Sequence, residues 1–320
     1  MYELLKGTPG MVLSLTLNSA LDHVLQIPPF ELNATLRAHS AHLAMGGKPT
    51  DASYILGTLG LPTHALALAA GSFGQRAEAM LQQRGVTTDF VWTRGETRLN
   101  TILVQSDGRG QTTLTADSLI VSEEHLAELE RRFLGALDRA GCVLLGGSLP
   151  SGVSPEWYAR LITLAAEQGV PVVFDSSGEG LRRGLQAGPT VVKPNRHELG
   201  ELAGGVLASL DEIAAAARQL HDLHNTSVVV TLGDQGAVAI LPNAAYHIPS
   251  LEVPVVNAAG AGDGVLAGMS AALAAGLPLE EGLRLGFAIA AAVLQTPATA
   301  DCSPEAVAGF LPKIELGPIL

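Results

Sequence analysis

The chain has 320 residues, of which 47% are hydrophobic and 16% charged, a composition typical of a globular protein and too apolar for a disordered one. Its net charge of −12, with no Lys/Arg run longer than two residues, argues against nucleic acid as a partner, because nucleic acid is bound by basic surfaces. No apolar stretch reaches the about 18 residues of a membrane span, and the cysteines Cys142 and Cys302 form no Cys-x-x-Cys pattern. We therefore expect a cytoplasmic protein without a membrane partner.

Short apolar runs alternate with helical patterns along the chain. Five nearly continuous apolar runs predict strands of a parallel sheet that is covered on both faces: Met11–Leu17, Cys142–Leu145, Pro171–Phe174, Thr190–Val192 and Ser227–Leu232. Ser154-Pro-Glu156 is a start signal for a helix over Trp157–Gln168. The capping-box pattern Ser209-Leu-Asp-Glu212 opens a second helix over Asp211–Leu223. The fold class that follows is α/β, with a doubly wound, mostly parallel sheet flanked by helices.

Two segments depart from this alternation. His23–Leu43 and Phe90–Leu114 mix polar and apolar residues with turn signals such as Ser106-Asp-Gly-Arg-Gly110, and this predicts half-exposed antiparallel strands. We interpret them as a small β lid, with a decorative edge hairpin as the alternative. The sequence contains no internal repeat or long linker, so we expect a single domain over residues 1–320, with lid strands from about 23–43 and 90–114. An open sheet edge on such a lid would favour a homodimer that forms through the lid.

A small-residue run near the C-terminal end, Asn257–Leu266, contains Gly260-Ala-Gly-Asp263 followed by an apolar segment. If Gly264–Ala275 is a helix, the amides of residues 260–263 lie at its positive end, where anions bind. Asp263 then places a carboxylate beside an anion hole, which suits activation of a hydroxyl for attack on a phosphate. The alternative is an ordinary glycine-rich loop in which the aspartate caps a helix.

Six further motifs precede this run in the chain. They are Thr16-Leu-Asn-Ser-Ala-Leu-Asp22, Gly46-Gly-Lys48, Gly146-Gly-Ser-Leu-Pro-Ser-Gly152, Phe174-Asp-Ser-Ser-Gly178, Lys193-Pro-Asn-Arg-His-Glu198 and Thr231-Leu-Gly-Asp-Gln-Gly236. From about Val12 to Ala300 the ordered set resembles the ribokinase-like (PfkB) carbohydrate kinase family, in its branch of 1-phosphofructokinases and tagatose-6-phosphate kinases. The resemblance implies a ribokinase-like fold and ATP-dependent phosphoryl transfer to a hydroxyl of a sugar phosphate.

The same resemblance implies roles for residues at the transfer end of the site. Asp263 would be the catalytic base, and Gly260, Ala261 and Gly262 the anion hole. Asn195 and Glu198 would place Mg²⁺ through water, since oxygen ligands and retained waters suit this ion. The residues implied in nucleotide binding are Lys193, Asn195, Thr231, Gly233 and Gly236. Taken by itself, Glu198 could equally be a first-turn helix carboxylate, and Lys193 a structural ion-pair partner.

The acceptor side draws on a separate group of residues. The expected acceptor-binding residues are Asp22, Gly46, Gly47, Lys48, Asp51, Arg98 and Asn100. Asp22 offers a fixed carboxylate to sugar hydroxyls, whereas Lys48 and Arg98 are candidates for a substrate phosphate. Asn100 would face the same side of its strand as Arg98, because side chains two residues apart share a face. The alternative is that Arg98 and Asn100 form only the solvated face of a lid strand.

The first signature departs from the family pattern Gly-Gly-Lys-Gly-x-Asn at Pro49 and Asp51. Pro49 removes a backbone N–H, and Asp51 loses an amide donor and adds a charge that disfavours a phosphorylated sugar unless Lys48 or Arg98 offsets it. In addition, Gly264 replaces a serine that often follows the aspartate. Two alternatives therefore stay open: a kinase of an unphosphorylated sugar or nucleoside, and a catalytically weak homologue that binds sugar or nucleotide. A requirement for a monovalent cation also stays open.

Overall fold

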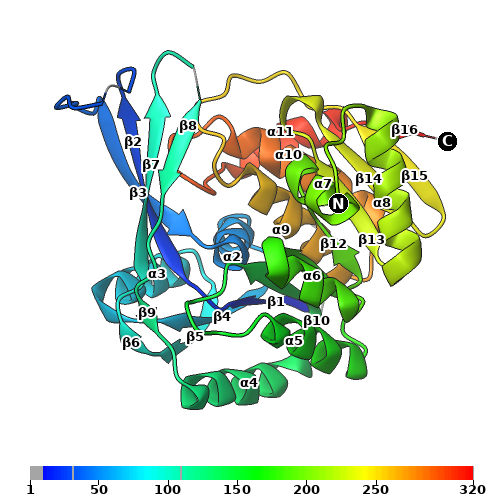
Figure 1. Cartoon of the computed structure of the whole chain (residues 1–320), viewed down its shortest axis with the longest axis horizontal. Coiled ribbons are helices and arrows are strands. Elements are labelled where there is room, and N and C mark those ends of the chain that lie inside the picture. Colours follow the sequence, from blue (N-terminus) through cyan, green and yellow to red (C-terminus); the bar gives the residue numbers. More distant parts are fainter. Residues whose placement is uncertain (1–9, 31, 109, 320) are drawn as a thin grey trace.

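A ten-stranded sheet forms the centre of the protein, of which the computed structural model describes residues 10–30, 32–108 and 110–319 (Figure 1). In spatial order its strands are β16 (Gly317–Pro318), β15 (Ala244–Ile248), β14 (Ala237–Leu241), β13 (Ser227–Thr231), β12 (Val191–Val192), β11 (Val172–Ser176), β10 (Ala140–Gly147), β1 (Met11–Thr16), β4 (Thr63–Ala69) and β5 (Thr87–Trp92). The pairs from β13 to β5 are parallel, and those from β13 to β16 are antiparallel. The predicted mostly parallel sheet is thus confirmed.

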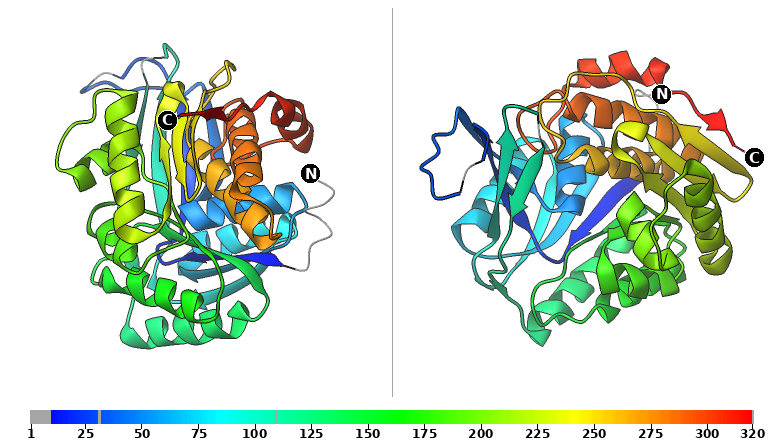
Figure 2. Two further views of the ribbon diagram at one scale, coloured as in Figure 1. Left: turned by 90° about the vertical axis from the view of Figure 1, so that its right-hand side faces the viewer. Right: turned by 45° about the horizontal axis from the view of Figure 1, so that its top comes forward.

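Two layers of helices cover the sheet (Figure 2). One face packs against α4 (Glu123–Leu137), α5 (Glu156–Glu167), α6 (Gly178–Gln186), α7 (Arg196–Ala203) and α8 (Leu210–His224). The other face packs against α2 (Lys48–Thr58), α9 (Ala261–Ala274), α10 (Leu279–Val293) and α11 (Pro304–Phe310). In β1, Leu13 and Leu15 join the first core and Val12 the second, because successive side chains of a strand point to opposite faces. This double burial explains the apolar runs in the sequence.

A second, four-stranded sheet stands beside the carboxyl ends of the parallel strands, at the upper left of Figure 1. Its order is β3 (Ser40–Gly46), β2 (Ala20–Ile27), β7 (Arg98–Gln105) and β8 (Gln111–Leu114). The outer pairs are antiparallel, whereas β2 and β7 run parallel with Asp22 opposite Asn100. The chain reaches β7 only after β4, α3 (Gly71–Gln83) and β5, and this crossover permits a parallel pair.

The strand that contains Phe90 belongs to the large sheet and not to the small one. This strand, β5, pairs with β4, and its residues Phe90 and Val91 are buried in two hydrophobic clusters. The contribution of the second predicted segment to the small sheet therefore begins only at Arg98. Two short strands, β6 (Arg94–Gly95) and β9 (Leu119–Ile120), pair in an antiparallel ribbon. They flank the segment of the chain that contains β7 and β8. Among residues 10–30, 32–108 and 110–319, no helix has the length and apolar character needed to cross a membrane.

Candidate active site

Charged and small residues from the predicted motifs meet at the carboxyl ends of the parallel strands. Asp175 lies near the end of β11, Lys193 follows β12, and Thr231 ends β13. Helices α2, α7 and α9 begin at the same edge, and α2 also packs against β3 of the four-stranded sheet. Open α/β sheets bind their ligands outside the carboxyl ends of the strands, so this edge is the candidate active site.

Helix α9 begins at Ala261, three residues earlier than the predicted start at Gly264. Its N-cap is Gly260, which has a left-handed φ of 85° and no room for a side chain, since a Cβ would lie 2.4 Å from the Ala300 nitrogen. Asp263 is therefore the third residue of the helix and not its cap, and its N–H donates to the Gly260 carbonyl at 3.1 Å. The predicted anion hole, Gly260–Gly262, does lie at the positive end of the helix dipole.

The Asp263 carboxyl group is buried among charges of both signs. Burial raises its pKa to about 7, with Asp175 and Asp22 acting in the same direction and Lys48 and Lys193 opposing them. A carboxyl group in this condition can both accept and release a proton near neutral pH. The carboxylate that the sequence singled out thus lies in an environment suited to proton transfer.

Asp175 holds two lysines of the site in place. Its Oδ1 accepts from Lys48 Nζ at 2.5 Å, and its Oδ2 lies 2.8 Å from Lys193 Nζ. Burial alone would raise the pKa of Asp175, but Lys193 and Lys48 hold it below its usual value. Burial likewise would lower the pKa of Lys48, but Asp175 raises it instead. A Cβ on Gly262 would lie 3.6 Å from Lys193 Nζ, so this lysine reaches the anion hole.

Sequence reasoning quoted Asp175 within a motif but gave it no role. The signal was an acidic residue directly after the predicted strand Pro171–Phe174, at the end of the sheet where ligands bind. The structure also changes the interpretation of Lys48, which was expected only as a partner for a substrate phosphate. It is an ion-pair partner of Asp175 as well, and its side chain is 36% exposed.

Asn195 and Glu198 form a reciprocal capping box at the start of α7. The Glu198 N–H donates to Asn195 Oδ1 at 2.9 Å, and the Asn195 N–H donates to Glu198 Oε2 at 2.8 Å. Glu198 is only 8% exposed and acts on the pKa of Lys48, so it borders the charged cluster. Glu198 is thus a first-turn carboxylate of α7, and the capping box fixes the position of its carboxylate.

The residues expected to contact a nucleotide differ in their surroundings. Thr231 forms a parallel bridge with Asn195, and its N–H donates to the Pro194 carbonyl at 3.1 Å. Gly233 has a positive φ of 65° and open space where a side chain would stand. Gly236 is different, because a Cβ there would lie 1.9 Å from the Ile248 carbonyl oxygen. Close packing against the end of β15 is therefore enough to explain this glycine.

The acceptor side centres on Asp22, in β2. Asn100 Nδ2 donates to Asp22 Oδ1 at 2.8 Å across the parallel strand pair, so Asn100 lies on the same face of the small sheet as Asp22. A Cβ on Gly46 would lie 2.5 Å from the same oxygen, which explains the glycine. Burial raises the pKa of Asp22, against the influence of Asn100, Thr299 and Arg98. Sequence reasoning missed Thr299, since nothing in the sequence places its loop beside β2.

Arg98 lies at the same end of the site, and its guanidinium group makes only long hydrogen bonds to the described residues. Its Nη2 donates to the Asn18 carbonyl at 3.5 Å and its Nη1 to Thr115 Oγ1 at 3.4 Å, both long contacts. Its buried Nε has no acceptor among the described residues. The guanidinium group is therefore available to a ligand, in contrast to the ammonium group of Lys48.

The unusual residues Pro49 and Asp51 lie in the first turn of α2. Gly47 caps this helix with a φ of 91°, and proline is readily accommodated in a first turn because its missing N–H would have no helical partner. Asp51 is 3% exposed and close enough to the Asp263 carboxyl group for a hydrogen bond. Burial, Asp263 and Asp22 raise the pKa of Asp51 well above its usual value. The substituted residue thus lies against the predicted base.

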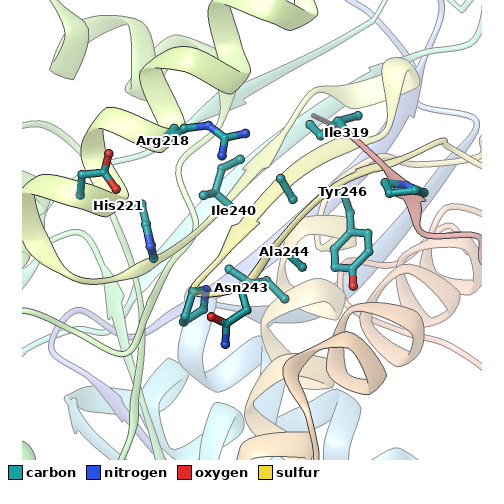
Figure 3. A pocket seen from close by; sticks show the side chains of 12 residues that line it. Arg218, His221, Ile240, Asn243, Ala244, Tyr246 and Ile319 are labelled. Atoms are coloured by element: carbon teal, nitrogen blue, oxygen red, sulfur yellow. The ribbon is translucent and has the colours of Figure 1, made fainter.

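A pocket of about 560 Å³ lies apart from this cluster, between α8, the β14–β15 hairpin and β16 (Figure 3). Figure 3 shows Arg218 and His221 on one side and Tyr246 on the other. His221 Nδ1 contacts the Thr226 carbonyl at 2.7 Å, and the Tyr246 hydroxyl donates to Glu280 at 3.4 Å. The residues that line this pocket belong to none of the predicted motifs, so we keep the candidate active site at the carboxyl ends of the strands.

Known proteins resemble this chain over most of its length. The profile described as "pfkB family carbohydrate kinase" matches residues 15–306. The chain is 30% identical over 276 residues to the 1-phosphofructokinase of Bacillus subtilis, covering 86% of this chain and 90% of that protein. It is 32% identical over 308 residues to the ATP-dependent 6-phosphofructokinase isozyme 2 of Mycobacterium tuberculosis, covering 95% and 90%.

The similar solved structures include phosphofructokinases as well. Phosphofructokinase-2 from Escherichia coli in complex with substrates and products superposes with a TM-score of 0.86 and 28% identity, covering 95% of this chain and 99% of that one. The same E. coli enzyme has been solved in complex with potassium and as a tetrameric inhibited form.

Proposed function

Because the chain belongs to the pfkB family of carbohydrate kinases, we propose that it transfers the γ-phosphoryl group of ATP to a hydroxyl of a sugar phosphate. The observation that carries this proposal is the buried carboxyl group of Asp263 in the first turn of α9. It lies between the lysine pair on Asp175 and the acceptor-side residues Asp22 and Asp51. One carboxylate therefore adjoins both the anion-binding groups and the polar acceptor end.

In the proposed reaction, the oxygen of the acceptor hydroxyl bonds to the γ-phosphorus, and Asp263 accepts the proton of that hydroxyl. The bond from phosphorus to the β–γ bridging oxygen breaks, and ADP leaves with that electron pair. The positive end of α9 and the Lys193 ammonium group stabilise the charge that spreads over the transferred group. Thr231, Gly233 and Asn195 lie at the strand ends beside Lys193 and would contact the nucleotide.

The donor set of Asn195 and Glu198 fits Mg²⁺, an ion that prefers oxygen ligands. Glu198 Oε2 accepts the capping hydrogen bond, and Asn195 and Glu198 would hold the ion through water. When bound, the ion would neutralise negative charge on the nucleotide phosphates. We also propose activation by a monovalent cation, because the similar E. coli enzyme was solved with potassium. Activity in potassium chloride compared with tetramethylammonium chloride tests this point, and equal rates would refute it.

A phosphorylated acceptor is supported by the polar groups at the acceptor end. Arg98 Nε and Asn100 Oδ1 are buried and have no hydrogen-bond partner among the described residues. Buried polar groups are normally paired, so these two indicate a polar ligand. The Arg98 guanidinium group suits a phosphate, and the Asp22–Asn100 pair suits sugar hydroxyls.

A coupled assay of ADP release tests the proposal. The panel consists of fructose 1-phosphate, fructose 6-phosphate, tagatose 6-phosphate, the free sugars and nucleosides. We expect turnover on at least one sugar phosphate and far slower turnover on the neutral compounds. Turnover on neutral acceptors alone would instead identify a kinase of an unphosphorylated sugar or nucleoside. No turnover on any compound, combined with calorimetric binding of ATP or sugar, would identify a catalytically weak homologue.

We further propose that the chain acts as one kinase domain in which the four-stranded sheet is a lid, and that two lids pair in a homodimer. The sheet order leaves β3 and β8 as edges, and Leu43 and Leu114 are exposed on these two strands. Sedimentation of Leu43→Glu/Leu114→Glu should show a monomer where the native protein is a dimer. Leu223→Glu, on the exposed face of α8, is the control. A monomeric native protein would contradict the proposal.

A further inference from the structure

Asp51 places a second carboxyl group against the proposed base. It lies in the first turn of α2, and Asp263 lies in the first turn of α9, two helices that pack against each other. Asp51 is 3% exposed, and its carboxyl group is within hydrogen-bonding distance of that of Asp263. The family pattern has asparagine at this position, whose amide could donate to Asp263 without a titratable proton. Asp51 can donate only when it is protonated.

The charges around Asp51 favour a shared proton. Asp263 from α9 and Asp22 from β2 face it with negative charge, and Arg98 from β7 faces it with positive charge. Two buried carboxylates at hydrogen-bonding distance repel each other strongly unless one carries a proton. Lys48 and Lys193 offset this repulsion only in part. Both favour the Asp263 carboxylate, but both are bound to Asp175, and burial still raises the pKa of Asp263 to about 7. Burial and Asp263 accordingly raise the pKa of Asp51 well above that of a free aspartate.

The other elements that pack on α2 carry few titratable side chains. Strand β1 carries no titratable side chain. The titratable residues of the remaining neighbours and of α2 itself are His42 of β3, His64 of β4, Arg76 and Glu78 of α3, Cys142 of β10, and Lys48 and Tyr54 of α2. The main influences on the Asp51 carboxyl group are its burial and the three groups Asp263, Asp22 and Arg98.

We propose that Asp51 is a positioning residue that holds one proton between its carboxyl group and that of Asp263. The proton orients the Asp263 carboxylate, leaves that carboxylate able to accept the proton of the acceptor hydroxyl, and keeps the acceptor end from carrying a further negative charge. Asp51 retains its own proton through the transfer, and the proton taken up by Asp263 leaves to solvent before the next turnover. The catalytic part of this inference rests on the proposed function, whereas the shared proton does not.

The pair loses its protons in two steps that belong to both residues together. The first step produces the active form, with one proton and one negative charge. The second step, at higher pH, places two negative charges beside the acceptor and repels a phosphorylated substrate. We therefore expect KM for a sugar phosphate to rise at alkaline pH while kcat changes little.

The shared proton can be tested without any activity measurement. A carboxyl group whose pKa is raised in the folded state destabilises the fold as pH rises from its unfolded value toward its folded value. In Asp51→Asn this penalty is absent. We therefore measure the Tm of the variant minus the Tm of the native protein at about pH 5 and at about pH 9. This difference should be larger at the higher pH by about 2–4 °C or more. Asp138→Asn, which removes an exposed carboxylate at the end of α4, should show a constant difference.

A double-mutant cycle with Asp263→Asn locates the effect in the pair. If the proton is shared, Asp263→Asn alone removes most of the pH-dependent penalty, and the double variant gains little more. The same single variant replaces Asp51→Asn as the test if the latter does not fold. The inference would be overturned if, for the variants that fold, the Tm difference from the native protein were the same at both pH values. It would also be overturned if the pH-dependent gains in Tm of the two single variants added up in the double variant.

The kinetic test uses the best acceptor from the ADP-release screen. In the native enzyme we expect KM for a sugar phosphate to rise about tenfold between about pH 7 and pH 9, and in Asp51→Asn to rise less than about twofold. A purely structural role for Asp51 would not remove this alkaline limb. An alkaline limb that persists unchanged in Asp51→Asn would overturn the positioning role, even where the stability test supports the shared proton.

Discussion

The transfer end and the acceptor end of the site manage buried charge in opposite ways. At the transfer end, one carboxylate, Asp175, is matched by two lysines, and its pKa is lowered. At the acceptor end, Asp22 and Asp51 lie near one arginine, Arg98, and the pKa values of both carboxyl groups are raised. Asp263 lies between the two ends, and burial raises its pKa as well. The two lysines at the transfer end can bind the negative charge of a nucleotide. At the acceptor end, protonation of the carboxyl groups limits the negative charge.

The departures from the family pattern follow the same division. Pro49 and Asp51 belong to the acceptor end, while the Gly260–Asp263 run retains its pattern. Gly264 borders that run, but packing explains it: a Cβ there would lie 2.8 Å from Ile289 Cγ2 and 3.0 Å from the Ala290 nitrogen. The unusual glycine thus reflects close contact between α9 and α10.

The largest effect on the transfer end should come from Asp263→Asn. The amide cannot accept the hydroxyl proton, so we expect kcat to fall by about 10²–10⁴-fold, the usual contribution of a general base. Nucleotide affinity should change little, because the helix N-terminus and Lys193 remain. Steady-state kinetics and calorimetry with ADP measure the two quantities, and near-normal turnover would refute the assignment of the base.

Asp175→Asn should cost the transfer end much of its stability. The change leaves two lysines without their buried partner, which we expect to lower the free energy of unfolding by about 3–5 kcal/mol. Because the pKa of Asp175 is lowered, its stabilisation is present above the unfolded pKa and is lost only as pH falls through the folded value. Chemical denaturation should therefore show the same deficit at pH values of about 5 and about 8. A deficit that grows with pH would contradict this sign.

Arg98→Lys should affect the acceptor end alone. Lysine keeps the charge but loses the planar fork that binds a phosphate through two parallel hydrogen bonds. We expect KM for a sugar phosphate to rise about tenfold, with KM for ATP unchanged. Equal increases in both constants would show that Arg98 supports the whole site and does not bind the acceptor phosphate.

Gly264→Ser, which introduces the residue common in the family, should have a smaller effect. The added side chain meets α10, so we expect a loss of stability of about 1–3 kcal/mol with kcat changed less. Thermal unfolding and steady-state kinetics measure the two. A variant as stable as the native protein would show that α9 and α10 can separate without cost.

Much of the fold could be predicted because burial on both faces leaves a clear trace in the sequence. The runs at Met11–Leu17 and Ser227–Leu232 correspond closely to β1 and β13. The placement of Phe90 was missed because an edge strand and a lid strand share the same mixed pattern, and only pairing with β4 distinguishes them. The start of α9 was placed late because the left-handed Gly260 replaces a capping side chain.

The candidate site divides in the same way. Asp263 could be identified because small residues, a carboxylate and an apolar helix stand together in sequence. Asp175 and Thr299 could not be assigned a role, since their importance arises from contacts across the sheet with Lys48, Lys193 and Asp22. The contact of Asp51 with Asp263 depends on the packing of α2 against α9, which no local pattern reveals.

The separation of the two ends is tested most directly by restoring the family pattern in Pro49→Gly/Asp51→Asn. The measurement is kcat/KM across the acceptor panel, together with KM for ATP, at an alkaline pH of about 9. We predict that kcat/KM for a sugar phosphate rises about tenfold, corresponding to about 1.4 kcal/mol, while KM for ATP stays within about twofold. An unchanged acceptor profile, or a KM for ATP that shifts as much as the acceptor constants, would contradict the account.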